Sequence, residues 1–456
     1  MHVAFVIAEL APYAQVGGLG AVAADLPPAL ARLGIEVTLI VPRHEGLTGL
    51  GTAGPAEIVT RSGTASTWIA EIEGVNLIAV DVDGLFSSGP VYRDNDLDRF
   101  GRFSVAVPDV LAATESKPDL VHAHDWHTAL VPAAITGVPT ILTIHNLAHQ
   151  GWFEVHNEWD LDGLVERNGW VGMLASGIAN ADVVTTVSPT YAAEIQTPEL
   201  GMGLDDILLK RGVTGIVNGI DVDEWNPASD PHLVEPYDTA HIDGKKANRA
   251  AVLEAFGLRD AGSPVAAVIS RFDHQKGLDL VPDAIKRLLT SGKLTLIALG
   301  TGDPELEERF SDLAASHPKN VAYRAEFDVG LAHLMEAGAD VFLMPSRFEP
   351  CGLNQMYSMR YGTIPIVHRT GGLVDTVEPW ADGRGTGFGF DELTTAALRH
   401  AVEAAVDLHS DADAWQQIMR NAMGRDFSWD ASASKYVELY ETALHEPTTE
   451  ASTRPS

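Results

Sequence analysis

The sequence predicts an α/β protein with two doubly wound domains, each built on a parallel sheet. Short β-rich runs alternate with helical stretches along the 456 residues, as parallel sheets require. Several runs, such as 37–41 and 295–299, are almost entirely apolar, which is typical of strands buried on both faces. A polar stretch with three prolines at 224–236 separates two series of runs and predicts a domain boundary near 225–240.

The individual strands follow from the apolar runs in chain order. The first series predicts strands at 3–9, 36–42, 76–82, 119–124, 139–145 and 183–188. The second series predicts strands at 264–270, 294–300, 339–344 and 364–368. Doubly wound sheets bind ligands beyond the carboxyl ends of their strands. We therefore expect the functional site there, in a cleft between the two domains.

Composition excludes several classes of protein. Hydrophobic residues make up 45% and charged residues 21% of the chain, as in ordinary globular proteins. The formal net charge of −32 repels polyphosphate backbones, so general nucleic-acid binding is not expected. Cys351 is the single cysteine and excludes an intramolecular disulfide. With no signal-peptide pattern and no apolar run of about 18 residues, we expect a cytoplasmic protein with no membrane partner.

A glycine-rich loop follows the first predicted strand and opens a helix. Gly18, Gly20 and Ala23 fit the dinucleotide-binding pattern G-x-G-x-x-A. However, the glycines come several residues after the strand, and the next strand ends in Pro-Arg-His with no acid for a ribose hydroxyl, which disfavours a nicotinamide cofactor. What remains is an expected anion site at a helix N-terminus, or a turn needed only for packing.

Histidines gather at the ends of two strands of the first domain. The run His122-Ala-His-Asp-Trp-His127 resembles a dizinc hydrolase motif, but its aspartate is one position early and no second cluster completes a site. We therefore expect no metal and interpret Asp125 as lining a strand-end cleft. His145 ends the next strand. A lone histidine at such a position is as often a structural hydrogen-bonding group as a functional residue.

In the second domain, cationic and glycine-containing turns follow the strands. Arg271 and Lys276 come directly after the first strand and could hold a diphosphate, although a solvated turn is the alternative. The segment 344–355 ends a strand, presents the carboxylate of Glu349 and turns into a helix at Gly352. No base flanks Cys351 in sequence, so we expect a packed residue rather than a nucleophile.

Together these segments resemble the bacterial glycogen synthases and plant starch synthases, retaining glycosyltransferases that use ADP-glucose. The matching stretches occur in the family's order and span about residues 1–445. They are 17–20, 122–127, 145–151, 217–221, 271–277, 345–355, 369–373 and 427–430.

The resemblance implies the GT-B architecture, in which two Rossmann-like domains face each other across a cleft. It implies an N-terminal, acceptor-side domain at 1–230 joined by a crossing helix at about 428–445, and a nucleotide-sugar-binding domain at 240–427. It also implies catalytic roles for Glu349, His145 and Asp125. The implied donor-binding residues are Gln15, Gly17, Gly18, Asn218, Arg271, Lys276, Phe327, Cys351, Gly352, Leu353 and Asn354, with Phe327 in the place of an adenine-stacking tyrosine.

The implied reaction is transfer of glucose from ADP-glucose to the non-reducing end of an α-1,4-glucan with retention, without metal or cofactor. Arg271 and Lys276 would stabilise the leaving diphosphate, while same-face attack lets the leaving phosphate accept the acceptor's proton. Domain closure about the 225–240 linker would exclude water. The oligomeric state is left open.

Two departures from the family pattern keep alternatives open. Gln15 stands where the family has lysine, and Ala21 where it usually has aspartate. Loss of an ammonium near a phosphate costs up to about 4 kcal/mol at an effective dielectric constant of 20. A transferase that uses UDP-glucose or another nucleotide sugar is one alternative, and a catalytically silent glucan-binding or regulatory protein is the other.

Overall fold

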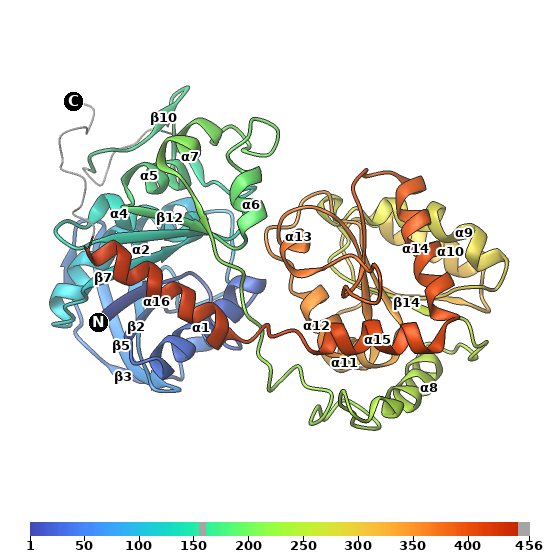
Figure 1. Cartoon of the computed structure of the whole chain (residues 1–456). Coiled ribbons are helices and arrows are strands. Elements are labelled where there is room, and N and C mark those ends of the chain that lie inside the picture. Colours follow the sequence, from blue (N-terminus) through green and yellow to red (C-terminus); the bar gives the residue numbers. More distant parts are fainter. Residues whose placement is uncertain (155–160, 446–456) are drawn as a thin grey trace. The chain divides into compact units, whose positions relative to one another are not determined.

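The computed structural model describes residues 1–154 and 161–445 and divides into two compact units. Unit 1 holds Met1–Gly219 together with the segment that begins at Trp429, and unit 2 holds Ile220–Ser428. Figure 1 shows unit 1 in blue to green, with a red helix added, and unit 2 in yellow-green to red-orange. All ten predicted strands are present.

Unit 1 is built on a sheet whose parallel strands are β1, β2, β6, β7, β8, β12 and β13. The sheet order is β13-β12-β8-β7-β1-β2-β6-β5-β3, so the winding direction reverses between β1 and β7. The strands are β1 (His2–Val6), β2 (Glu36–Pro42), β6 (Val75–Val82), β7 (Leu120–His124), β8 (Thr140–Ile144), β12 (Val183–Thr186) and β13 (Thr214–Gly215).

One edge of this sheet is antiparallel, an addition that the sequence did not predict. β5 (Gly63–Ile72) pairs with β6 through a tight turn in which Glu73 and Gly74 have φ of 50° and 79°. Two consecutive left-handed residues produce the twist that a two-residue hairpin needs. β3 (Thr52–Ala53) and β4 (Ile58–Thr60) extend this edge. β9 (Trp152–Glu154), β10 (Glu166–Arg167) and β11 (Trp170–Gly172) form a separate small sheet.

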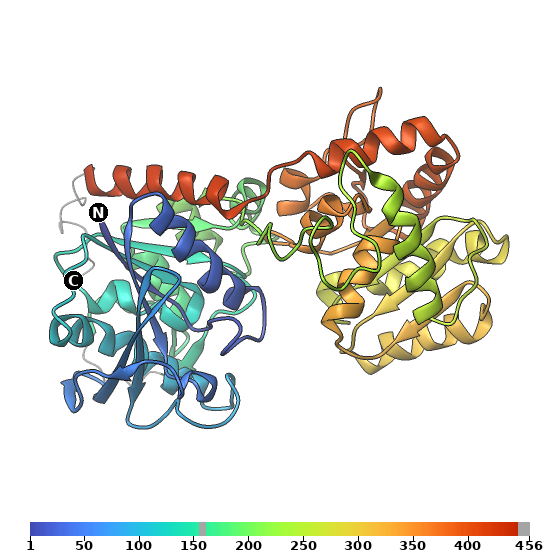
Figure 2. The ribbon, with the colours of Figure 1, turned by 90° about the horizontal axis from the view of Figure 1, so that it is seen from below.

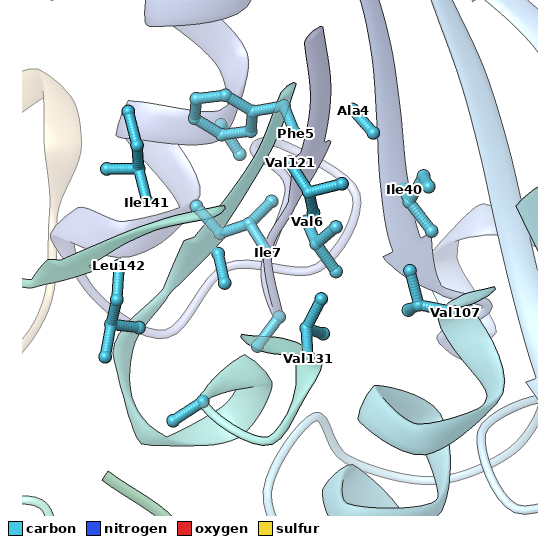
Figure 3. Close-up of a cluster of buried hydrophobic side chains, with 14 of the residues drawn as sticks. Ala4, Phe5, Val6, Ile7, Ile40, Val107, Val121, Val131, Ile141 and Leu142 are labelled. Atoms are coloured by element: carbon cyan, nitrogen blue, oxygen red, sulfur yellow. The ribbon is translucent and has the colours of Figure 1, made fainter. Parts of the chain in front are cut away.

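Helices cover the main sheet of unit 1, and its core lies between the layers. In Figure 3, side chains of β1, β2, β7 and β8 meet Val107 and Val131 from the covering helices. The helices are α1 (Gly18–Arg32), α2 (Asp96–Ala113), α3 (Asp125–Thr128), α4 (Val131–Ala134), α5 (Met173–Asn180), α6 (Pro189–Glu194) and α7 (Asp205–Arg211), with a 3-10 turn η1 (Glu45–Leu47).

The last described helix, α16 (Trp429–His445), belongs to unit 1 and lies beside α1 (Figures 1 and 2). The indole Nε1 of Trp429 donates to Asp25 at 3.0 Å, and Arg32 forms an ion pair with Asp430. Gly219 packs against this helix start so closely that an added Cβ would lie 2.5 Å from the Cα of Trp429. Only glycine therefore fits where the chain leaves unit 1.

Unit 2 has a fully parallel sheet in the order β16-β15-β14-β17-β18-β19. Its strands are β14 (Val265–Ile269), β15 (Thr295–Leu299), β16 (Val321–Arg324), β17 (Val341–Met344), β18 (Ile364–His368) and β19 (Phe388–Phe390). Its helices are α8 (Lys245–Ala255), α9 (Val281–Thr290), α10 (Pro304–Ser316), α11 (Val329–Gly338), α12 (Asn354–Arg360), α13 (Gly372–Thr376), α14 (Thr395–His409) and α15 (Ala412–Met423), with 3-10 turns η2 (Ile242–Gly244), η3 (His274–Lys276) and η4 (Leu278–Leu280).

The segment between the two sheets packs against unit 2. The indole of Trp225 is stacked between the rings of His333 and Tyr357, with centroids 3.9 and 3.8 Å away. The buried carboxylate of Asp230 accepts from the hydroxyl of Tyr361 at 2.5 Å and pairs with His333 at 2.8 Å. These contacts explain why the compact units change at Gly219–Ile220, whereas the sequence placed the boundary near 225–240.

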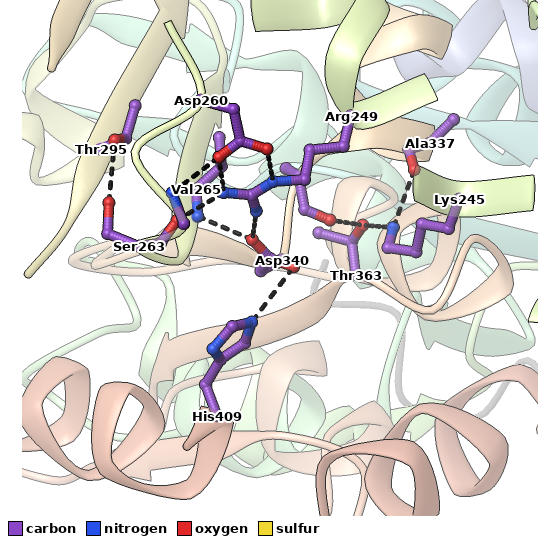
Figure 4. A network of polar contacts seen from close by, with 12 residues as sticks. Lys245, Arg249, Asp260, Ser263, Val265, Thr295, Ala337, Asp340, Thr363 and His409 are labelled. Atoms are coloured by element: carbon purple, nitrogen blue, oxygen red, sulfur yellow. Dashed lines mark hydrogen bonds and ion pairs between the residues drawn. The ribbon is translucent and has the colours of Figure 1, made fainter. Parts of the chain in front are cut away.

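A polar network joins the amino ends of the unit 2 strands to their helices (Figure 4). Arg249 on α8 forms ion pairs with Asp260 and with Asp340, which precedes β17. The Arg249 guanidinium lowers the pKa of Asp260 to about 2. Asp340 also accepts the N–H of Val265 at 2.8 Å. This network lies at the end of the sheet opposite to the loops that follow the strands, so it is structural. No helix in the described ranges is long and apolar enough to cross a membrane.

Candidate active site

The loops at the reversal point of each sheet carry the predicted site residues. In unit 2 the reversal lies between β14 and β17, which are followed by 270–277 and 345–353. In unit 1 it lies between β1 and β7, which are followed by the glycine-rich loop and by Asp125. Doubly wound sheets bind ligands at this point because the two flanking loops diverge and leave a crevice.

A cavity of about 190 Å³ lies at the reversal point of unit 2. It brings together five of the predicted donor-binding residues, and residues at the ends of β14 and β17 also line it. The residues that line it include Ile269, Ser270, Arg271, Lys276, Leu278, Met344, Ser346, Gly352, Leu353 and Asn354.

An ion pair stands beside this cavity. Lys276 Nζ lies 2.7 Å from Oε2 of Glu349, and the same oxygen accepts from the hydroxyl of Ser346 at 2.9 Å. The carboxylate is buried, with 5% of Glu349 exposed, whereas Lys276 is partly exposed toward the cavity. Among the described residues, no hydrogen bond uses Oε1 of Glu349, so this oxygen remains available to a ligand.

Local backbone geometry brings these two groups together. Asp273 caps the turn η3 by accepting the N–H of Lys276, and Gly277 then adopts φ of +63°. A Cβ at Gly277 would lie 1.9 Å from the carbonyl oxygen of Pro345, so glycine lets the two loops approach. The amide of Asn354 donates to the carbonyl of Ile269 at 2.7 Å and fixes the start of α12 to the end of β14.

Arg271, by contrast, is held loosely. Its side chain is 71% exposed and pairs with Asp273 at 3.3 Å. A neighbouring guanidinium, that of Arg347, is locked by a two-pronged ion pair with Asp279 at 2.7 and 2.9 Å. Arg271 is therefore the more adaptable cation, whereas Arg347 braces the loop that carries Glu349.

Two predicted residues of unit 2 do not line the cavity. Cys351 is buried, and its carbonyl accepts from the amide of Gln355 at 3.1 Å. Cys351 is thus enclosed by the protein and is not part of the cavity lining. Phe327 lies in the loop before α11 and is 88% exposed. Such exposure of a phenyl ring leaves a face free for stacking.

The glycine-rich loop of unit 1 is occupied in part by a residue that the sequence did not single out. The buried carboxylate of Glu9 accepts the N–H groups of Val16 and Gly17 at 2.8 and 3.1 Å. Glu9 also accepts from the hydroxyl of Tyr92 at 2.5 Å. The part of the predicted anion site that Glu9 does not occupy is the first turn of α1, which begins at Gly18 and which no side chain caps. In the sequence, this role of Glu9 is indicated only by its position directly between a buried strand and a glycine-rich loop.

Asp125 and His145 meet at the ends of β7 and β8. Oδ1 of Asp125 accepts the backbone N–H groups of His145 and Asn146 at 2.8 and 3.3 Å. Asp125 holds a left-handed φ of +57°, which is uncommon for a residue with a Cβ and is often found at functional sites. Burial raises the pKa of Asp125 to about 7 and lowers that of His145 to about 3.

Gln15 and Asn218 complete the predicted set in unit 1. The exposed Gln15 lies against the first turn of α1, where a Cβ at Gly20 would be 2.9 Å from its Cγ. Asn218 is buried, and its Oδ1 has no hydrogen-bond partner among the described residues. A buried oxygen without a partner is costly unless a ligand completes it. Within residues 1–154 and 161–445, no group of three or more His, Cys, Asp or Glu is arranged to hold a metal ion.

The raised pKa of Asp125 predicts a pH-dependent stability difference. Between pH 3.8, the ordinary pKa of an aspartate, and about pH 7, Asp125 is protonated in the folded state but ionised in the unfolded state. Its contribution to the free energy of unfolding therefore falls as the pH rises through this range. Asn at position 125 keeps the acceptor oxygen and does not titrate. We expect the free energy of unfolding of Asp125→Asn, relative to the parent, to increase from pH 4 to 7 and then level off. Urea unfolding across this range checks it, and a difference independent of pH would contradict it.

Comparison with known proteins decides the family. The family model described as the starch synthase catalytic domain matches residues 2–210, and the model for glycosyl transferases group 1 matches residues 253–422. A glycogen synthase of Anaeromyxobacter sp. (strain Fw109-5) is 43% identical, over 97% of this chain and 99% of its own length. A glycogen synthase of Streptococcus sanguinis is 40% identical, over 97% of this chain and 100% of its own length.

The chain belongs to the glycogen synthase family.

Among solved structures, the catalytic domain of starch synthase IV from Arabidopsis thaliana, bound to ADP and acarbose, is 32% identical. It matches with a TM-score of 0.87 over 98% of this chain and 99% of that chain. Sucrose-phosphate synthase from Thermosynechococcus elongatus, at 19% identity and a TM-score of 0.65, shows the shared fold. The predicted two-domain α/β fold of the GT-B class is therefore confirmed, and this member of the glycogen synthase family is a glycosyltransferase.

Proposed function

We propose that the protein is an ADP-glucose-dependent glycogen synthase that adds glucose to the non-reducing end of an α-1,4-glucan with retention. The observation that carries the proposal is the pairing of Lys276 with Glu349 beside the unit 2 cavity. A cation and a buried carboxylate there match the two charges that develop when a glycosyl diphosphate bond breaks. The bacterial relatives named glycogen synthase and the ADP-bound starch synthase structure support this substrate class.

The leaving diphosphate would lie in the unit 2 cavity. Lys276 would contribute a fixed positive charge, since Glu349 already orients its ammonium. Arg271, which is mostly exposed, would close onto the diphosphate with its planar fork. Gly352, Leu353 and Asn354 line the same cavity. Phe327, with an exposed ring, would stack on the adenine base.

Glu349 would face the transferred glucose. Two donors hold its Oε2, so the carboxylate keeps one orientation while Oε1 can accept from a sugar hydroxyl or stabilise positive charge at C1. We assign it no covalent role. In same-face attack, the C1–O bond to the diphosphate breaks as the acceptor hydroxyl bonds to C1, and its proton passes to a leaving phosphate oxygen.

Unit 1 would supply groups for the sugar and the acceptor. Asp125 holds the backbone of His145 in place, so these two residues act together. Asn218 offers an unpartnered carbonyl oxygen, which a hydroxyl of the donor would complete. Gln15, Gly17 and Gly18 would flank the phosphate at the start of α1, where Glu9 accepts the N–H of Gly17 but no side chain caps the helix.

A donor comparison tests the proposal. Glucose incorporation into glycogen and nucleotide release are measured with ADP-glucose and with UDP-glucose, each with and without EDTA. We expect polymer growth with ADP-glucose that EDTA does not change. A preference for UDP-glucose would show that ADP-glucose is the wrong donor in this proposal. If the folded protein turned over neither donor, a catalytically silent glucan-binding protein would be favoured.

Gln15→Lys is expected to tighten ADP binding by up to about tenfold, because an ammonium near the first turn of α1 would attract the diphosphate. Gln417→Lys, on the exposed face of α15, is the matched control, since it adds the same charge at a position outside the cavity lining. Titration calorimetry with ADP measures both. Equal or weaker binding by Gln15→Lys would show that position 15 does not face the phosphate.

A further inference from the structure

The ring of His145 is held by a second histidine, His124, which the proposed reaction does not use. Nδ1 of His124 lies 3.0 Å from Nε2 of His145. His124 ends β7 and is fully buried, and its ring packs in tilted contact against the rings of Phe5 and His122, with centroids 4.1 and 4.0 Å away. Close packing in this fully buried position restricts rotation of the ring, so its two nitrogens keep their places.

The other nitrogen of His124 decides where the hydrogen sits. Nε2 of His124 is buried and has no hydrogen-bond partner among the described residues. A buried N–H without an acceptor is rarer and more costly than a lone pair without a donor. His124 therefore carries its hydrogen on Nδ1 and donates it to Nε2 of His145.

This hydrogen bond fixes the tautomer of His145. An imidazole whose Nε2 accepts a hydrogen bond carries its own hydrogen on Nδ1 when it is neutral. Burial keeps both rings neutral, since it lowers the pKa of His145 to about 3 and that of His124 well below its ordinary value. Within the described ranges no residue hydrogen-bonds to Nδ1 of His145, and the side chain is only partly buried.

We infer that His124 is a positioning residue that holds His145 as its Nδ1–H tautomer, so that His145 presents a hydrogen-bond donor to a sugar oxygen. The sugar ligand of His145 rests on the proposed function, whereas the tautomer of His145 rests on the contact between His124 and His145. A neutral imidazole with Nδ1–H toward the ligand cannot take the acceptor's proton, so His145 is not the general base. The proton then goes to the leaving phosphate.

The test compares Phe and Asn at position 124. His124→Phe keeps an aromatic ring packed against Phe5 and His122 but removes the donor, whereas His124→Asn loses the aromatic ring and keeps an N–H close to the place of Nδ1. If His124 served only packing, Phe would be the better substitute. If it positions His145, we expect Asn to retain most of kcat and Phe to lower it about tenfold, the loss of one buried hydrogen bond.

The direct readout is the nitrogen chemical shift of His145 in protein with ¹⁵N-labelled histidine, without substrate. The signals are assigned by their absence in His145→Asn. We expect a protonated Nδ1 and an unprotonated Nε2 in the parent and in His124→Asn, and a change in His124→Phe. A protonated Nε2 in the parent, or full activity with an unchanged tautomer in His124→Phe, would overturn the inference.

These readouts separate the inference from the proposed function. The tautomer is measured on the free enzyme and does not depend on turnover. If no nucleotide sugar were used but His145 carried its hydrogen on Nδ1, the substrate assignment would fall and the positioning role would stand. If His124→Phe did not fold, the spectrum of the parent protein alone would still decide the tautomer.

Discussion

Lys276→Ala is expected to lower kcat/KM for the donor sugar by about a hundredfold or more. The change removes a charged hydrogen bond to the diphosphate, and such bonds contribute roughly 1.5–3 kcal/mol each. It also leaves the buried carboxylate of Glu349 with the hydroxyl of Ser346 as its remaining partner on Oε2. Both effects act on the step in which charge separates, so kcat should fall as well as affinity.

The matched control is Lys246→Ala. Lys246 also forms a 2.7 Å ion pair, with Asp243, but its side chain is 82% exposed and lies outside the cavity lining. Exposed pairs of this kind contribute little to stability or function. We expect parent activity from Lys246→Ala and, from Lys276→Ala, a folded protein with the large loss of kcat/KM, judged by circular dichroism and the transfer assay. Unchanged transfer by Lys276→Ala would remove the cation from the proposed mechanism.

Gly277→Ala is expected to destabilise unit 2 by about 3 kcal/mol or more and to abolish ADP binding. The left-handed backbone at φ +63° costs about 1 kcal/mol for alanine. The larger cost comes from the Cβ, which would lie 1.9 Å from the carbonyl oxygen of Pro345. The loop that carries Glu349 must then move away from Lys276, so stability and the site are lost together.

Gly292→Ala separates the two costs. Gly292 has a similar φ of +69°, but nothing lies within 4 Å of the position of its Cβ. We expect a loss of about 1 kcal/mol and unchanged ADP binding, because backbone strain acts there alone. Urea unfolding and calorimetry measure both variants. Equal destabilisation by the two substitutions would show that the contact with Pro345 does not hold the loops together.

The strands were predictable because burial on both faces leaves an apolar run in the sequence. β1, β2, β14 and β15 lie where such runs occur, and the matching motifs indicated the family before any geometry was known. The edge hairpin of β5 and β6 was missed in part, since β5 alternates buried and exposed residues and its turn depends on a left-handed glutamate. Local patterns of this kind are weak in sequence.

For the site, the sequence determined which chemical groups follow which strands. Glu349, Lys276, Arg271, Asp125 and His145 were expected in the segments that follow strands, and the structure places all five there. Their order along the chain is enough for this, because in a doubly wound sheet the loops at one edge are fixed by the alternation of strand and helix.

Only the tertiary structure decided the partners of these groups. Residues 73 positions apart, Lys276 and Glu349, form an ion pair because Gly277 lets their loops meet. Glu9 accepts hydrogen bonds from backbone N–H groups of the glycine-rich loop. His124 and His145, which lie at the ends of the neighbouring strands β7 and β8, are within hydrogen-bond distance of each other. The tautomer of a histidine and the partner of a buried carboxylate depend on atoms brought together by folding. A linear sequence carries the groups, whereas the folded chain sets the distances on which their hydrogen bonds depend.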